Sequence, residues 1–166
     1  MLSFLPNYIF PAITDVSETF LRERNIRLLL LDFDNTMLPY TKNEPSRELL
    51  QWIEHMRAAD VTLCIVSNSH KPRVTDFSKR YGVPCVTGAK KPRGKGIREA
   101  LRRFDVPVAQ TALIGDQIYT DVLGANLAGA CSIIVRSIHN HNFWLKLRHA
   151  FEVPFLVIAR KRRVKL

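Results

Sequence analysis

Short apolar runs alternate along this chain with segments of helical periodicity. Five runs are bounded by polar residues and lie near 27–33, 61–66, 83–86, 111–114 and 131–135. Such runs are typical of strands that are buried on both faces of a sheet. Apolar side chains recur at i, i+3 and i+4 in residues 49–56 and 94–104, which predicts helices, and we expect two more over 70–81 and 118–127. This alternation predicts an α/β fold with a doubly wound parallel sheet.

Two carboxylates, Asp32 and Asp34, follow the run Leu28–Leu31. The two-residue period of a strand places both on the same side of the backbone. At about 4 Å and an effective dielectric constant of about 20, they repel each other by roughly 4 kcal/mol. The pair therefore requires a cation, a shared proton or solvent. Taken alone, it fits either a solvated acidic turn or a functional site.

Two other predicted strands also end in polar residues. Ser67 and Asn68 follow one of them, while Asp116 follows the other, with Asp121 five positions later. Ligands of open α/β sheets bind beyond the carboxyl ends of the strands. If these strands are neighbours, their polar side chains converge on one crevice. Hard carboxylate oxygens there suit Mg²⁺, and a substrate phosphate commonly completes the coordination shell of that ion.

Four motifs in this order resemble those of haloacid dehalogenase (HAD)-type phosphatases. They are Asp-Phe-Asp-Asn-Thr at 32–36, Ser67, Lys91-Pro92, and Gly-Asp at 115–116 with Asp121. The resemblance covers about residues 27–136. It extends to the YqeG-type group of class IIIA in the stretches 34–36, 66–69, 90–95 and 115–124. Members of that group and their mitochondrial relatives are linked to dephosphorylation of phosphatidylglycerophosphate. The resemblance therefore implies a HAD-like Rossmannoid fold and a phosphatase.

The resemblance also implies catalytic roles. Asp32 would attack phosphorus and form an aspartyl phosphate, and Asp34 would protonate the leaving oxygen and later deprotonate water. Lys91 would offset the charge of the nucleophile and the phosphate. Lys90 is adjacent, and the sequence alone does not fully exclude it; Lys91 is preferred because it precedes the proline, as in the family pattern.

By the same resemblance, Mg²⁺ would be held by the Asp32 carboxylate, the Asp34 main-chain carbonyl and Asp116. Asp121 would act on the metal through water or a neighbouring group.

The remaining site residues carry hydroxyl or amide groups. Ser67 and the Asn68 amide would hydrogen-bond the phosphoryl oxygens. Thr36 would orient Asp34 or its loop, and a plain capping hydroxyl is an equal alternative.

The spacing between the motifs leaves no room for an inserted cap domain. Only a helix and a strand fit between Asp34 and Ser67, and only a helix, a short strand and a loop fit between Ser67 and Lys91. A capless site is open to bulky substrates. This favours a phosphate on a macromolecule, a lipid headgroup or a large nucleotide.

Length and charge limit the remaining interpretations. The 166 residues suit one domain over 1–166, with a core of about 27–136 and appendages at 1–26 and 137–166. The formal net charge of +10 favours anionic partners. Three widely spaced cysteines without a CxxC pair indicate free thiols in a reducing compartment.

Both ends of the chain leave two interpretations open. The apolar side chains of 1–26 would pack on the domain or contact a membrane interface. The segment 137–166 would be a docked helix with a solvated tail, or would bind an anionic membrane through its basic residues, Arg160, Lys161, Arg162, Arg163 and Lys165. Nucleic acid competes for the same charge, but we rank it lower because no nucleic-acid module is recognisable.

No apolar run approaches the roughly 18 residues that span a bilayer, and the start lacks a signal-peptide pattern. We expect a cytoplasmic protein, with peripheral contact to the inner face of the membrane as an added hypothesis. The sequence leaves the oligomeric state open.

Three functional hypotheses follow. The first is a Mg²⁺-dependent phosphomonoesterase that dephosphorylates phosphatidylglycerophosphate to phosphatidylglycerol. The second keeps the enzyme class but takes a soluble nucleotide or another phosphoester. The third is a non-catalytic HAD module that binds anionic surfaces or RNA.

Overall fold

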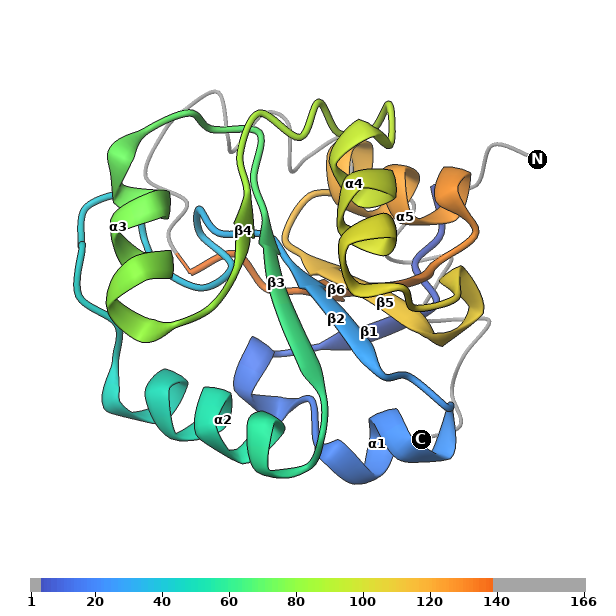
Figure 1. The fold of residues 1–166 in the computed structure, drawn as a ribbon, viewed down its shortest axis with the longest axis horizontal. Coiled ribbons are helices and arrows are strands. Elements are labelled where there is room, and N and C mark those ends of the chain that lie inside the picture. Colours follow the sequence, from blue (N-terminus) through green and yellow to red (C-terminus); the bar gives the residue numbers. More distant parts are fainter. Residues whose placement is uncertain (1–3, 139–166) are drawn as a thin grey trace.

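Six parallel strands form one sheet with helices on both faces in the computed structural model, which describes residues 4–138 (Figure 1). The strands are β1 (Tyr8–Phe10), β2 (Leu28–Leu31), β3 (Thr62–Val66), β4 (Cys85–Val86), β5 (Thr111–Gly115) and β6 (Cys131–Val135). Their order in the sheet is β1-β6-β5-β2-β3-β4, and every neighbouring pair is parallel. The predicted doubly wound α/β sheet is therefore confirmed.

The helices occupy the connections between strands. They are α1 (Glu18–Glu23), α2 (Arg47–Ala58), α3 (Pro72–Tyr81), α4 (Lys95–Phe104) and α5 (Leu123–Ala128), with short turns η1 (Ile13–Asp15), η2 (Val108–Gln110) and η3 (Ile118–Val122). The hydroxyl of Ser46 accepts a hydrogen bond from the Leu49 amide and starts α2. Gly82 ends α3 with φ +65°, a conformation that glycine adopts without strain.

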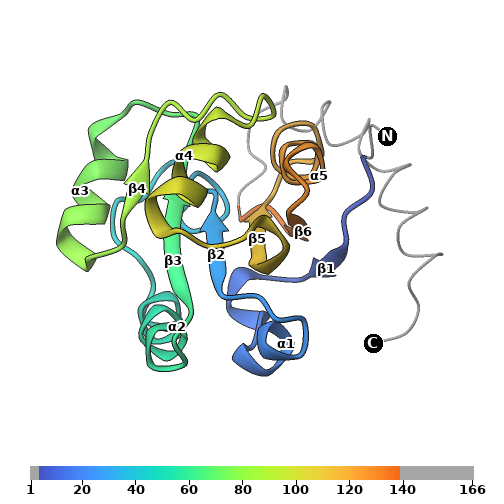
Figure 2. The ribbon, with the colours of Figure 1, turned by 45° about the vertical axis from the view of Figure 1, so that its right-hand side comes forward.

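The leucine run of β2 supplies both halves of the core. Leu29 and Leu31 pack in the cluster that includes α1, α2 and α3, whereas Leu28 and Leu30 pack with α4 and α5. Figure 2 shows α1 and α2 on one side of the strands, with α4 and α5 on the other. A strand covered on both faces must be apolar at every position, which explains the uninterrupted run.

The N-terminal segment contributes an edge strand that the sequence analysis did not predict. β1 pairs with β6, and Asn7 and Ser132 exchange hydrogen bonds beside it. Phe20 of α1 packs edge-on against Tyr8 and Phe10. The strand has three residues and lies between two prolines, too short to show a period-two pattern. Its apolar side chains pack against the sheet and α1.

The predicted helix over 118–127 begins as a wider π-helical turn, η3. The amides of both Asp121 and Val122 bond to the Gln117 carbonyl, and Asp121 Oδ2 accepts the Gln117 amide at 3.1 Å. Such turns occur mostly as single insertions in helices and are frequent at functional sites.

The segments between the site motifs contain only regular elements of the core. The chain from 37 to 66 holds a loop, α2 and β3, and that from 68 to 90 holds α3 and β4. No cap domain is inserted in either segment, as predicted. Over residues 4–138, no helix is both long enough and apolar enough to cross a membrane. The predicted membrane contact of the basic segment falls almost wholly on 139–166, outside the described residues.

Candidate functional site

The carboxyl ends of β2, β3 and β5 meet at one edge of the sheet. Leu31 pairs with Ile65 on one side and with Ile114 on the other, so the polar residues after each strand lie together. A cavity of about 320 Å³ opens there. Its lining comprises Asp32, Asp34, Tyr40, Ser67, Asn68, Ser69, Lys71, Lys91, Gln117 and Thr120. The predicted convergence is therefore present.

Lys91 lies at the centre of this edge and is buried. Its Nζ is 2.6 Å from Asp32 Oδ1 and 2.7 Å from Asp121 Oδ1. Lys90 is exposed to solvent. The structure thus separates the two lysines that the sequence left open, and only Lys91 reaches the carboxylates.

Three carboxylates form the acidic group beside Lys91. Carboxylate oxygens of Asp32, Asp116 and Asp121 all lie within 4.8 Å of one another, and all three residues are buried. Asp121 thus lies closer to the others than we expected. Hard oxygens from three buried carboxylates at this spacing fit a divalent cation.

The electrostatics of this group reflect three carboxylates that are buried close together. Burial raises the pKa of Asp116 to about 7, and the charges of Asp32 and Asp121 add to the shift. Burial also raises the pKa of Asp121 to about 6, against the opposing effect of Lys91. Burial lowers the pKa of Lys91, but the charges of Asp121 and Asp32 outweigh it, and the net shift is upward. Both raised pKa values mean that Asp116 and Asp121 hold a proton more readily than free carboxyl groups do.

Thr36 contacts the acidic group rather than Asp34. Its Oγ1 lies 3.2 Å from Asp32 Oδ2 and 3.4 Å from Asp116 Oδ1. The sequence analysis had linked this hydroxyl to Asp34 or to its loop. The turn that follows β2 brings it back toward the strand end, where it holds the two carboxylates in place.

Asp34 is paired with Arg73, a residue that the sequence analysis missed. Arg73 Nη1 lies 2.8 Å from Asp34 Oδ1, and the two side chains are only 12% and 10% exposed. The same guanidinium donates to the carbonyls of Pro39 and Lys42. Burial raises the pKa of Asp34, Arg73 opposes this, and Asp32 adds to it. Arg73 therefore fixes both the carboxyl and the loop that follows it.

Asn68 lines the cavity, and its predicted contact with phosphoryl oxygens stays a prediction, but its side chain also bonds to the backbone of Lys91. Its Nδ2 donates to the Lys91 carbonyl at 3.0 Å, and its Oδ1 accepts from the Lys91 amide at 2.7 Å. Both ends of the side-chain amide are thus bonded to backbone, and Asn68 positions Lys91. Ser67 lines the cavity and accepts a hydrogen bond from the Ser69 amide at 3.1 Å, so its own proton is available to a phosphoryl oxygen.

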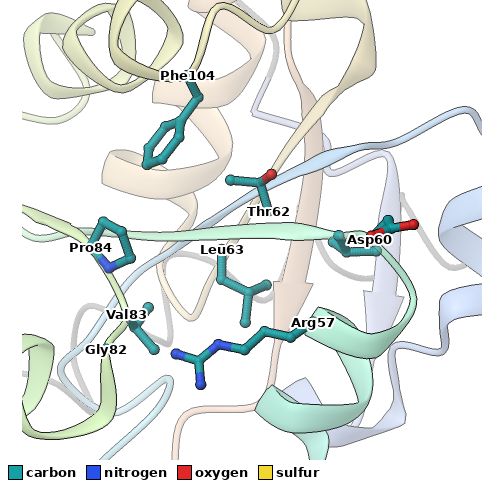
Figure 3. Close-up of a pocket in the computed structure, with 9 residues that line it drawn as sticks. Arg57, Asp60, Thr62, Leu63, Gly82, Val83, Pro84 and Phe104 are labelled. Atoms are coloured by element: carbon teal, nitrogen blue, oxygen red, sulfur yellow. The ribbon is translucent and has the colours of Figure 1, made fainter.

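A second cavity of about 290 Å³ lies at the opposite end of β3 (Figure 3). Arg57 extends into it from α2, and Phe104 faces it from α4. The Arg57 guanidinium is bonded to the Tyr81 carbonyl and to Glu54. Its lining includes Thr62 and Leu63 at the start of β3, whereas Ser67 of the first cavity follows the end of that strand. It lacks a cluster of catalytic groups.

Comparison with known proteins agrees with this geometry. A sequence model of the family described as "Mitochondrial PGP phosphatase" matches residues 2–138. The chain is 35% identical over 132 residues to "Probable phosphatase YqeG" of Bacillus subtilis, covering 80% of this chain and 77% of that protein. It is 23% identical over 109 residues to "Glyceraldehyde 3-phosphate phosphatase" of Pyrococcus abyssi, covering 60% of this chain and 45% of that protein.

Solved structures share the fold. A 4-nitrophenylphosphatase from Thermotoga maritima superposes with a TM-score of 0.60 at 14% identity, covering 75% of this chain and 91% of the other. A cobalt-bound deoxy-D-mannose-octulosonate 8-phosphate phosphatase from Haemophilus influenzae gives 0.53 at 16% identity, covering 82% and 92%. The family match and the YqeG relative show that this chain belongs to the mitochondrial PGP phosphatase family of HAD-type phosphatases.

Proposed function

We propose that this phosphatase is a Mg²⁺-dependent phosphomonoesterase that acts through an aspartyl phosphate on Asp32, with phosphatidylglycerophosphate as its substrate. The observation that carries the proposal is the contact of Lys91 Nζ with Asp32 at 2.6 Å and with Asp121 at 2.7 Å, beside Asp116. This arrangement places an ammonium group against the nucleophile and offsets negative charge where a phosphate would enter.

The first chemical step is an in-line displacement. An oxygen of Asp32 forms a bond to phosphorus while the bond to the leaving oxygen breaks. Asp34 gives its proton to that oxygen, and its raised pKa supports this role. Asp34 then removes a proton from water, which attacks the aspartyl phosphate and releases inorganic phosphate. Asp32 is regenerated.

The acidic group would hold the metal. Asp32, Asp116 and Asp121 present oxygen ligands of the kind that Mg²⁺ prefers. When bound, the cation would neutralise charge on the phosphoryl oxygens and on the carboxylates. The related fold from Haemophilus influenzae, described as cobalt-bound, is in accord with a divalent ion.

Three observations support a phospholipid substrate. The cavity is uncapped, so a phosphate at the end of a bulky group can reach it. The matching family is described by PGP phosphatase activity. The formal net charge of +10 favours an anionic surface.

The test is phosphate release from phosphatidylglycerophosphate in anionic vesicles, with Mg²⁺, with EDTA, and with Asp32→Asn. We expect release that EDTA abolishes and that Asp32→Asn lowers by at least ~10³-fold. Asp76→Asn is the matched control, because Asp76 is exposed on α3. Full Mg²⁺-dependent activity in Asp32→Asn would refute the mechanism.

A soluble phosphoester is the second candidate. The relative from Pyrococcus abyssi is described as a glyceraldehyde 3-phosphate phosphatase. Higher kcat/KM on small phosphomonoesters than on the lipid in vesicles would favour this candidate and leave the mechanism intact.

A further inference from the structure

Within residues 4–138, Lys71 is the cation of the active-site cavity for which no carboxylate partner is found. Lys91 is bound to Asp32 and Asp121, and Arg73 is bound to Asp34 and to main-chain carbonyls. Among the described residues, no carboxylate oxygen lies within 4.0 Å of Lys71 Nζ, yet Lys71 lines the cavity. An ammonium group at a phosphate site is thus left for a ligand.

Lys71 lies on the side of the cavity that the leaving group would occupy. It immediately precedes α3, and its Nζ is 5.9 Å from the centre of the Tyr40 ring, within cation–π range. Asp34 lines the same cavity, and Arg73, two residues after Lys71, lies 2.8 Å from its carboxylate, so the start of α3 reaches this side of the site. Asp34 must lie next to the leaving oxygen to protonate it.

We propose that Lys71, supported by Tyr40, forms a subsite for a second phosphate carried by the leaving group. This inference rests on the proposed function and deepens it. In phosphatidylglycerophosphate, the leaving oxygen belongs to a glycerol whose far end carries a phosphodiester. As that glycerol departs past Asp34, its diester anion meets Lys71. Tyr40 is 49% exposed and forms the outer wall of this path.

The test uses two soluble substrates, so that binding to vesicles plays no part. One is deacylated phosphatidylglycerophosphate, which keeps both phosphates, and the other is glycerol 3-phosphate, which has one. For each enzyme, the readout is the ratio of the two kcat/KM values with Mg²⁺. Any general loss of activity cancels in this ratio.

We expect the wild type to prefer the two-phosphate substrate, and Lys71→Gln to lower the ratio by about fivefold to tenfold through KM. Lys79→Gln is the matched control, because it removes the same charge from an exposed position near the end of α3. It should leave the ratio unchanged.

Three results would overturn the subsite: no preference in the wild type, an unchanged ratio in Lys71→Gln, or an equal loss in Lys79→Gln. In each case Mg²⁺-dependent hydrolysis of both compounds would leave the proposed phosphatase mechanism standing. If neither compound is hydrolysed, both the subsite and the proposed phosphatase mechanism are contradicted.

Glycerol 1,3-bisphosphate, whose second phosphate is a free monoester, separates the two sources of the anion. A larger effect of Lys71→Gln on the diester supports a lipid headgroup as the ligand. A larger effect on the bisphosphate supports a soluble substrate with the same subsite.

Discussion

Replacing Asp116 by asparagine should stabilise the metal-free protein at neutral and alkaline pH. The pKa of Asp116 is raised from 3.8 to about 7 in the folded protein because the group is buried beside other carboxylates. Between these values the folded state holds a proton that the unfolded chain has lost. Stability therefore falls as the pH rises from about 4 to about 7 and then stays low. The neutral amide of Asp116→Asn removes this loss.

The size of the effect follows from the same shift. Each pKa unit corresponds to about 1.4 kcal/mol, so the whole loss is at most about 4 kcal/mol. Between pH 5 and pH 8, the advantage of Asp116→Asn over the wild type should grow by up to about 3 kcal/mol. Asparagine keeps an oxygen for the Thr36 hydroxyl, now 3.4 Å from Asp116 Oδ1.

The assay is urea unfolding in EDTA at pH 5 and pH 8, with Asp76→Asn as the control for loss of an exposed carboxylate. Adding Mg²⁺ at pH 8 should stabilise the wild type more than Asp116→Asn, because the variant lacks one charged ligand. An Asp116→Asn protein that is no more stable than the wild type at pH 8 in EDTA would refute the reasoning. It would show that the carboxylates are not confined together without a cation.

Two further substitutions test the surroundings of the catalytic groups. Arg73→Gln should raise the pKa of Asp34, so the fall of kcat at alkaline pH should move to higher pH, with a loss in kcat of about tenfold or more. An unchanged pH profile of kcat, or the same shift in the exposed variant Arg80→Gln, would contradict the pairing of Arg73 with the catalytic acid. Gly115→Ala would place a Cβ against the Asp121 carboxylate and should lower kcat/KM by about 10²-fold with secondary structure retained by circular dichroism; full activity would show that Asp121 has room to move.

The sequence predicted the strands and the location of the site best where a residue pattern had a single physical explanation. Leu28–Leu31 is apolar at every position because helices cover both faces of β2, and the strand position follows directly. The polar residues after β2, β3 and β5 then converge because parallel strands end at one edge. The proline after Lys91 indicated which of two adjacent lysines reaches the site.

Other features depend on pairings that single-residue patterns do not encode. Arg73 is one of 25 basic residues, and nothing in its neighbours marks it as the partner of Asp34. Its place in the first turn of the helix after Ser67 was the available signal, because that turn faces the same edge of the sheet. The sequence also carried no sign that both ends of the Asn68 side-chain amide bond to the backbone of Lys91.

Charge balance explains why these groups occur together. By formal charge, the three carboxylates of Asp32, Asp116 and Asp121 and the ammonium of Lys91 sum to two negative units, while Asp34 is paired separately with Arg73. A single divalent cation would neutralise the buried group, whereas Lys91 alone does not. The pKa values of Asp116 and Asp121 are raised, which is the direction expected for carboxylates with excess negative charge around them. Lys91 would therefore not replace a metal: it lowers the formal charge of three buried carboxylates to an amount that one divalent ion would balance, so that the site would then accept an anionic phosphate.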